Sequence, residues 1–162
     1  MPPRADWIAV IGPGDVRSPE VLDSAEEAGA AVAEAGAILV CGGLGGVMEA
    51  ACRGARSRGG VTVGILPGGD REDANGWVSI ALPTGLGEAR NALIARAADA
   101  VVAIGGGWGT LSEIALACRL GRPVVGVGSW VVSHRDVADP TVEQAQDAAQ
   151  AVRWVLAQLG HA

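Results

Sequence analysis

The sequence predicts an α/β fold of the doubly wound, Rossmann-like class, with a mostly parallel sheet of about six strands and helices on both of its faces. Short apolar runs alternate with longer helical segments along the chain, a pattern typical of a parallel sheet that is covered on both sides. Glycine (25 residues) and alanine (30 residues) make up about a third of the 162 residues, which favours helices packed closely on a sheet. We expect a single domain covering residues 1–162, because domains usually contain roughly 100–150 residues.

Six apolar runs are the expected strands: 7–11, 37–41, 61–66, 77–82, 100–104 and 123–127. Five helices are expected: 19 to about 34, 47 to about 58, 87 to about 98, 110 to about 120, and a last one ending near 159. Ser18 and Pro19 are typical of an N-cap and a first helical position, and Thr141 is the expected cap of the last helix. Glycine-rich turns follow the first, second and fifth strands. Ligands of doubly wound folds bind at such carboxyl strand ends, near the topological switch point.

The charged residues exclude several classes of function. The chain carries 12 arginines, no lysine and 18 acidic residues, for a net charge of −6. Without lysine there is neither a Schiff base for pyridoxal-phosphate chemistry nor a Walker A loop. An acidic chain without a basic cluster is also a poor candidate for binding nucleic acid or an anionic membrane. We therefore expect neither as a partner.

The cysteine and histidine patterns favour a cytoplasmic protein without a protein-held metal. Cys41, Cys52 and Cys118 form no C-x-x-C pair, and reduced core thiols are the simplest interpretation. No H-E-x-x-H motif is present. Residues 1–7 lack an apolar signal-peptide core, and no apolar run reaches the roughly 18 residues of a membrane span. The loop around His134 holds serine and aspartate residues, but without a G-x-S-x-G elbow a catalytic triad is not favoured there.

The turn after the fifth strand, Gly105-Gly-Gly-Trp-Gly-Thr110, carries the strongest motif. Glycine amides without Cβ atoms can approach a ligand closely. The first amides of the following helix have no partner within it, and with the helix dipole they favour an anion, most often a phosphate. The candidate ligand-binding residues here are Gly106, Gly107, Trp108, Gly109 and Thr110. The alternative is a tight strand-to-helix turn without a ligand.

Glu113 and Arg90 are the candidate catalytic residues. Thr110-x-x-Glu113 matches a capping box, which its spacing alone favours. A carboxylate beside a phosphate also suits glycosidic chemistry, in which it stabilises positive charge at a ribose carbon or positions a water. Arg90 starts the helix before the fifth strand and could clamp a phosphate or hold a carboxylate. The alternative for Arg90 is a weak surface ion pair.

The turns after the first and second strands are further candidates for the same crevice. Gly12 and Gly14 follow the first strand, and the segment GGLGGVME follows the second. From that segment the candidates are Gly42, Gly43, Gly45, Gly46, Met48 and Glu49. Close packing of helix on strand is the alternative. No strict G-x-G-x-x-G occurs, which argues against an NAD enzyme. Trp108 could either cover a base or pterin ring or close a contact between two copies of the chain.

The segment GGGWGTLSE resembles the PGG-x-GT-x-x-E motif of the Lonely-guy family, whose relatives are often labelled lysine decarboxylase-like. The resemblance extends from the first strand to about residue 127. It implies hydrolysis of the N-glycosidic bond of nucleoside 5′-monophosphates, catalysed by Arg90 and Glu113. It also implies a homodimer, and a phosphate held by the residues Gly106, Gly107, Gly109 and Thr110.

Two departures point to a smaller sister group. Gly105 stands where that motif has proline, and Asn91 stands where the hydrolases have lysine. The segment ARN…VVAIGGGWGTLSEIALA is similar to molybdenum-cofactor carrier proteins, which bind a pterin phosphate without transforming it. Two functions are therefore expected: a phosphoribohydrolase that requires no cofactor, or a carrier with molybdenum cofactor as cargo. A weaker third interpretation is a nucleotide sensor that signals through its dimer surface.

Overall fold

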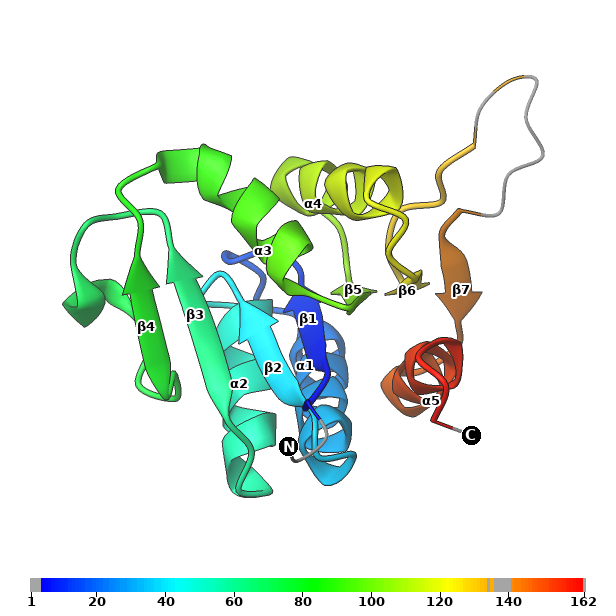
Figure 1. The fold of residues 1–162 in the computed structure, drawn as a ribbon, viewed down its shortest axis with the longest axis horizontal. Coiled ribbons are helices and arrows are strands. Elements are labelled where there is room, and N and C mark those ends of the chain that lie inside the picture. The colour runs from blue at the N-terminus through cyan, green and yellow to red at the C-terminus, as the bar shows by residue number, and fades with distance from the viewer. Residues whose placement is uncertain (1–3, 134, 136–140, 162) are drawn as a thin grey trace.

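The structure is a computed structural model that describes residues 4–133, 135 and 141–161. Its seven-stranded sheet has the order β4-β3-β2-β1-β5-β6-β7, and every neighbouring pair of strands is parallel. The strands are β1 (Trp7–Ile11), β2 (Ile38–Cys41), β3 (Thr62–Leu66), β4 (Ile80–Pro83), β5 (Ala100–Ile104), β6 (Val124–Val127) and β7 (Glu143–Ala145). The expected Rossmann-like α/β class is confirmed (Figure 1).

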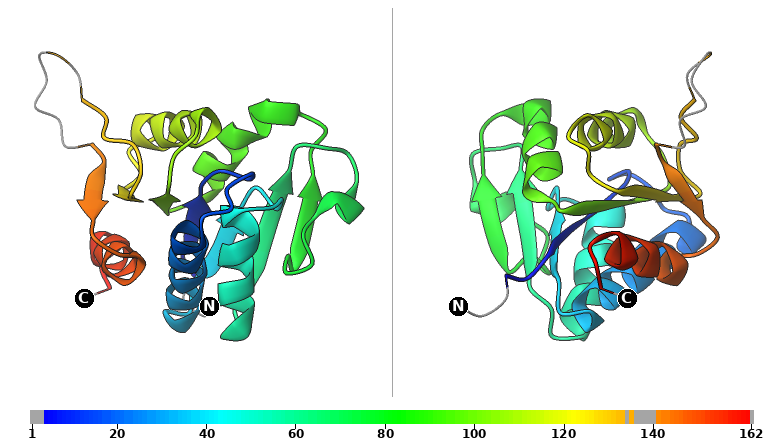
Figure 2. Two further views of the ribbon diagram at one scale, coloured as in Figure 1. Left: turned by 180° about the vertical axis from the view of Figure 1, so that it is seen from behind. Right: turned by 45° about the vertical axis from the view of Figure 1, so that its right-hand side comes forward.

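Two layers of helices cover the sheet, as Figure 2 shows. The helices are α1 (Pro19–Glu34), α2 (Val47–Ser57), α3 (Asn91–Ala97), α4 (Trp108–Arg119) and α5 (Ala148–Gln158), with short 3₁₀ turns η1 (Arg71–Asp73) and η2 (Gly87–Arg90). The first core packs α1, α2 and α5 against side chains such as Ile8, Val10 and Leu39. The second core packs α3 and α4 against Ala9, Val40 and other side chains of the opposite face. Because successive strand residues point to opposite faces, continuous apolar runs supply both cores.

Helices α1 and α2 lie in backbone contact, which explains part of the small-residue composition. A Cβ atom on Gly29 would lie 1.9 Å from the carbonyl oxygen of Ala51, and one on Gly54 would lie 1.9 Å from that of Glu26. The two glycines thus allow each helix to approach the other closely. The Arg53 guanidinium joins the same helices across their solvent side, with Nη2 donating to the Glu26 carboxylate at 2.8 Å.

The last helix begins later than expected, and the prediction that Thr141 caps it is wrong. Asp147 is the N-cap, and its Oδ1 accepts the Gln150 amide at 2.7 Å. The preceding residues form β7, which pairs with β6 in the register Val125↔Glu143. This seventh strand is short and exposed, with the sequence Glu-Gln-Ala. The residues of β7 show no apolar pattern, so β7 forms only because the edge strand β6 offers main-chain groups for pairing.

The fourth strand also starts later than the apolar run suggested. Ser79 donates its amide to Thr62 Oγ1 at 2.8 Å, and the same hydroxyl donates to the carbonyl of Trp77 at 2.7 Å. The Ser79 amide also donates to the Thr62 carbonyl at 3.0 Å, and residues 76–77 form a turn closed by a bond from the Val78 amide to the Asn75 carbonyl at 3.2 Å. The regular strand β4 therefore begins at Ile80. The expected helix 87–98 is likewise divided, because residues 87–90 form the tighter η2 turn before α3.

No helix in the part of the chain that the structure describes has the length and apolar content of a membrane span.

Candidate functional site

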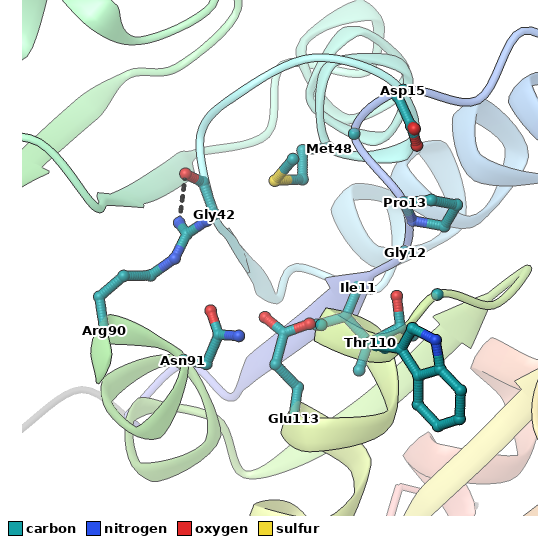
Figure 3. Close-up of a pocket in the computed structure, with 14 residues that line it drawn as sticks. Ile11, Gly12, Pro13, Asp15, Gly42, Met48, Arg90, Asn91, Thr110 and Glu113 are labelled. Carbon is teal, nitrogen blue, oxygen red and sulfur yellow. Dashed lines mark hydrogen bonds between the residues drawn. The ribbon is translucent and has the colours of Figure 1, made fainter. Parts of the chain in front are cut away.

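The carboxyl ends of β1, β2 and β5 surround a cleft of about 360 Å³, shown in Figure 3. From β1 the chain first adds β2, β3 and β4 on one side of the sheet and then β5, β6 and β7 on the other. The cleft lies at this change of direction, which is the topological switch point of the sheet. Ten residues singled out from the sequence line it: Gly12, Gly14, Gly42, Met48, Arg90, Gly107, Trp108, Gly109, Thr110 and Glu113. Ile11, Pro13, Asp15 and Asn91 complete the lining.

The amino terminus of α4 forms one wall of this cleft. Gly107 is its N-cap in an extended conformation (φ −149°, ψ 171°), and Trp108 is its first residue. The Gly107 carbonyl accepts the Leu111 amide at 2.9 Å, whereas the amides of the first turn have no partner inside the helix. A Cβ on Gly109 would meet nothing within 4 Å, and one on Gly107 would meet only Pro13, at 3.8 Å. The helix end is therefore open to an anion from the cleft side.

Arg90 is fixed by main-chain carbonyls of two neighbouring strand segments. Its Nη1 donates to the carbonyl oxygen of Gly42 at 2.6 Å and also to that of Ile65 in β3. The side chain is 9% exposed. A Cβ on Gly42 would lie 2.5 Å from Arg90 Nη1 and 2.6 Å from Met48 Sδ. Only glycine at position 42 therefore leaves room for this placement of the guanidinium.

One donor of that buried guanidinium has no partner. The Nε atom of Arg90 is inaccessible to solvent and makes no hydrogen bond, and an unpaired buried donor costs about 1–3 kcal/mol. Burial lowers the pKa of Arg90, and the nearby Glu113 carboxylate opposes this effect. Arginine stays cationic under such conditions. Because Arg90 lines the cleft, its fixed positive charge favours an anionic ligand there.

Glu113 faces the same cleft from α4. It is 9% exposed, and burial raises the pKa of its carboxyl to about 7, against a smaller lowering by Arg90. In Figure 3 the Asn91 side chain lies between Arg90 and Glu113. Within the described residues no ion pair joins Arg90 to Glu113. Glu113 is therefore a carboxyl group that changes protonation near neutral pH inside a pocket, a property found at many functional sites.

The capping-box interpretation of Glu113 is wrong. Gly107 is the N-cap of α4, which places Thr110 at the third helical position and Glu113 at the sixth. A capping box requires the serine or threonine at the N-cap and the glutamate three residues later. Glu113 is thus too far along the helix to reach the N-cap amide, and its side chain points into the cleft instead.

Five residues considered from the sequence lie outside the cleft lining: Gly43, Gly45, Gly46, Glu49 and Gly106. Gly46 has a φ of +61°, and a Cβ there would lie 2.4 Å from the carbonyl oxygen of Pro13. Gly43 packs on Gly64 of β3. Glu49 lies on a separate shallow surface groove beside Arg53. For Gly43 and Gly46, close packing, which was the alternative to ligand binding, describes the observed geometry.

Two tryptophans flank the start of α4, of which sequence reasoning considered only Trp108. The ring centroids of Trp108 and Trp130 are 5.2 Å apart, with planes tilted by 38°. Trp130 donates its indole Nε1 to the Gly107 carbonyl at 3.0 Å, which supports the N-cap residue. Trp130 lies 23 positions away from that residue, so no local motif marks it. Trp108 is 79% exposed beside the cleft.

The described residues contain no group of three or more His, Cys, Asp or Glu side chains suited to hold a metal ion. His134 and the aspartates at 136 and 139, considered from the sequence, lie outside the described residues. Cys41 and Cys52 are buried free thiols, with their Sγ atoms 3.4 Å apart below the cleft residue Gly42. Their burial agrees with the interpretation of these cysteines as small core residues.

The fold and the cleft define a class of protein: a Rossmann-like α/β protein with a helix amino terminus, a buried arginine and a buried glutamate at one strand-end cleft. The chain belongs to the SLOG cluster4 family, whose model matches residues 6–156. A relative in Archaeoglobus fulgidus, an uncharacterized protein, is 43% identical over 125 residues, which cover 77% of this chain and 82% of that protein. The resemblance inferred from the glycine motif is confirmed at the level of this superfamily.

Solved structures similar to this chain include two that are described by their cargo. The molybdenum cofactor binding protein of the phototrophic bacterium Rippkaea orientalis is 34% identical, with a TM-score of 0.89, over 96% of this chain and 98% of that one. The Moco carrier protein of Chlamydomonas reinhardtii is 37% identical, with a TM-score of 0.86, over 98% of this chain and 100% of that one. The similarity thus extends over nearly the whole of each protein.

Proposed function

We propose that this chain binds a phosphorylated pterin and carries it without transforming it, with molybdenum cofactor as its cargo. One observation carries the proposal: the open amino terminus of α4 and the fixed, mostly buried side chain of Arg90 line the same cleft. Both features favour a phosphate, the first through free amides and the second through a fixed positive charge. The similarity to proteins described as binding or carrying this cofactor supports the identity of the cargo.

The remaining lining residues suit the organic part of such a ligand. Pro13 and Trp108 offer apolar surface beside the phosphate-binding amides. Glu113 and Asp15 offer acceptors for ring N–H and amino groups, which a pterin presents along one edge. Asn91 offers both a donor and an acceptor. Rings held by apolar contact and a few polar groups are typical of small-molecule sites.

A specific observation also favours a second function, the hydrolysis of nucleoside 5′-monophosphates. Glu113 is buried, has a pKa of about 7 and shares its cleft with Arg90. A general base works best with a pKa near the working pH. In that reaction Glu113 would position a water or stabilise positive charge at the anomeric carbon, and Arg90 would hold the ribose phosphate. The similar carrier proteins favour the first function over this one.

Product release separates the two functions. The purified chain is incubated with a panel of nucleoside 5′-monophosphates, and free base is followed by chromatography, with Glu113→Gln as the control. The carrier function predicts no release with any nucleotide, together with measurable binding of 6-hydroxymethylpterin phosphate by calorimetry. Release that disappears in Glu113→Gln would establish the hydrolase instead.

Gly107→Val tests the phosphate site itself. Valine is compatible with the extended backbone at Gly107, and its Cβ has space on the side of Pro13. We expect a folded protein that loses affinity for the pterin phosphate by about tenfold or more, because the side chain occupies the anion position. Gly69→Val is the matched control, since a Cβ on Gly69 meets nothing within 4 Å and Gly69 lies outside the cleft. Retained affinity in Gly107→Val would place the anion elsewhere.

A further inference from the structure

The indole of Trp130 contacts the first residues of α4 from the segment that follows β6. Its Nε1 donates to the Gly107 carbonyl at 3.0 Å, and its ring faces that of Trp108. Trp130 is half-buried against the second core, and its carbonyl accepts from Gln144 Nε2 of β7 at 3.2 Å. Trp130 does not line the cleft, so its effect on a ligand passes through the residues that it contacts.

We propose that Trp130 is a positioning residue for the phosphate of the ligand, and that it acts through the peptide group between Gly107 and Trp108. This inference rests on the proposed function and adds to its phosphate site a residue from outside the cleft. It implies that the Trp130 indole contributes to the affinity for the phosphate and not to the affinity for the pterin ring.

The peptide group between Gly107 and Trp108 links the indole to the anion position. The Gly107 carbonyl accepts from the Leu111 amide at 2.9 Å and from Trp130, and its two lone pairs accommodate both donors. In a trans peptide the amide points away from the carbonyl, so the Trp108 amide points out of the start of α4, where the helix offers it no partner. Donation to the carbonyl polarises the peptide and strengthens the hydrogen bond that the amide donates. The indole therefore increases the attraction of this amide for a phosphate.

Gly106 has a part in the same arrangement, although it does not line the cleft. A Cβ at this position would lie 3.1 Å from Trp130 Nε1 and 3.4 Å from its Cδ1. Both distances are shorter than the roughly 3.5–4.0 Å of favourable carbon contacts. A side chain at position 106 would thus displace the indole from its hydrogen-bonding position. Contact with the indole, rather than with a ligand, accounts for the second glycine of GGGWGT.

Two ligands that differ only in a phosphate test the proposal. Calorimetry measures the dissociation constants of 6-hydroxymethylpterin and of its phosphate for the unaltered chain and for Trp130→Phe, which keeps an aromatic ring but loses Nε1. We expect Trp130→Phe to bind the phosphate about fivefold more weakly, which corresponds to one lost hydrogen bond, and to bind the free pterin within about twofold. Trp154→Phe, at a half-buried position of α5 outside the cleft, is the matched control and should change neither constant.

Gly106→Ala is a second variant, which keeps Trp130 and decides the question if Trp130→Phe does not fold. Alanine is compatible with the backbone at Gly106, which lies outside the left-handed region. Because its Cβ displaces the indole, we expect a loss of about twofold or more in affinity for the pterin phosphate alone. The double variant should bind no more weakly than Trp130→Phe, since residues that act through one contact are not additive.

The possible outcomes separate this proposal from the function on which it rests. Equal weakening of both ligands in Trp130→Phe would show that the indole only supports the fold, and unchanged binding of both would show that it does not act on the site. Either result would overturn the proposal. Additive losses in the double variant would overturn the part assigned to Gly106. Equal affinities of the unaltered chain for the two pterins, or binding of neither, would overturn the phosphate site itself.

Discussion

Glu113 shows how burial alone can prepare a side chain for function. It lies inside a helix rather than at its cap, and its carboxyl loses most of its contact with water. Arg90 is near enough to lower the pKa of this carboxyl, but burial has the larger effect. Since the guanidinium is already bound to two carbonyls, it compensates the buried carboxylate only in part.

This environment predicts a stability that falls as the pH rises through the slightly acidic range. The folded chain holds the Glu113 proton up to a pKa of about 7, whereas the unfolded chain releases it near 4.5. Between these values the folded state binds more protons, so the free energy of unfolding decreases with pH, by about 3 kcal/mol at most, and then levels off. Glu113→Gln should remove this decrease and unfold at a higher temperature than the unaltered chain at pH 8.

Thermal unfolding of both proteins at pH 5, 6 and 8 checks this prediction. The difference between them should be small at pH 5 and largest at pH 8, because glutamine stays neutral throughout. Glu113→Asp keeps the charge and serves as a comparison. A glutamine variant that is less stable at pH 8 would show that the carboxylate makes favourable contacts in the folded state, contrary to its unpartnered geometry.

At the scale of elements, the helix starts show where sequence patterns are reliable. The glycine turn before α4 and the Ser18-Pro19 start of α1 were predicted to within two residues. In both cases the local residues determine the backbone: glycines open a turn, and proline fits the first helical position. The start of α5 was not predicted, because β7 pairs with an edge that only the folded sheet provides.

The cap of α5 can be tested directly. Asp147→Ala removes the acceptor of the Gln150 amide, and we expect the free energy of unfolding to fall by about 1 kcal/mol. Asp147→Asn keeps a capping oxygen and should lose much less. Urea unfolding of the three proteins measures the difference. Equal losses in both variants would indicate that the charge of Asp147, rather than its hydrogen bond, stabilises the helix.

The cleft residues also have some features that local sequence patterns predict and others that depend on the folded sheet. Sequence patterns located the glycine turns and both charged residues of the site, since each follows or precedes a recognisable strand. They did not show that Arg90 is held by carbonyls 48 and 25 positions away along the chain. Nor did they separate the turn glycines that line the cleft from those that only pack, such as Gly43. Those distinctions depend on which strands become neighbours.

At the scale of the whole molecule, the cleft joins segments that are far apart in sequence. Loops after β1, β2 and β5 and the η2 turn all contribute to it, whereas α5 contributes no residue to its lining. Figure 1 shows α5 away from the carboxyl ends of these strands. A ligand that bridges these loops should therefore stabilise them together. Segments that contribute no residue to the cleft should become more stable only through the higher free energy of global unfolding.

Hydrogen exchange should reveal this pattern. With pterin phosphate at about 100 times its dissociation constant, we expect the folded state to gain about 2.7 kcal/mol and the melting temperature to rise by about 5–10 °C. Local slowing of exchange should be greatest at residues 12–15, 42–43 and 107–113. The end of α5 near Ala157 is exposed and should exchange as before, because helix ends open by local fraying rather than by global unfolding. Slowing confined to α5 would contradict the position of the site.

The attachment of Arg90 also bears on how such a pocket can be redesigned. Its positive charge is held by main-chain oxygens, and the anion site that we propose opposite it consists of main-chain amides. Neither half depends on the identity of a wall side chain such as Met48, Asn91 or Trp108. These walls can therefore be replaced in combinatorial libraries to alter ligand preference while the anchoring charges stay in place, provided that position 42 remains glycine.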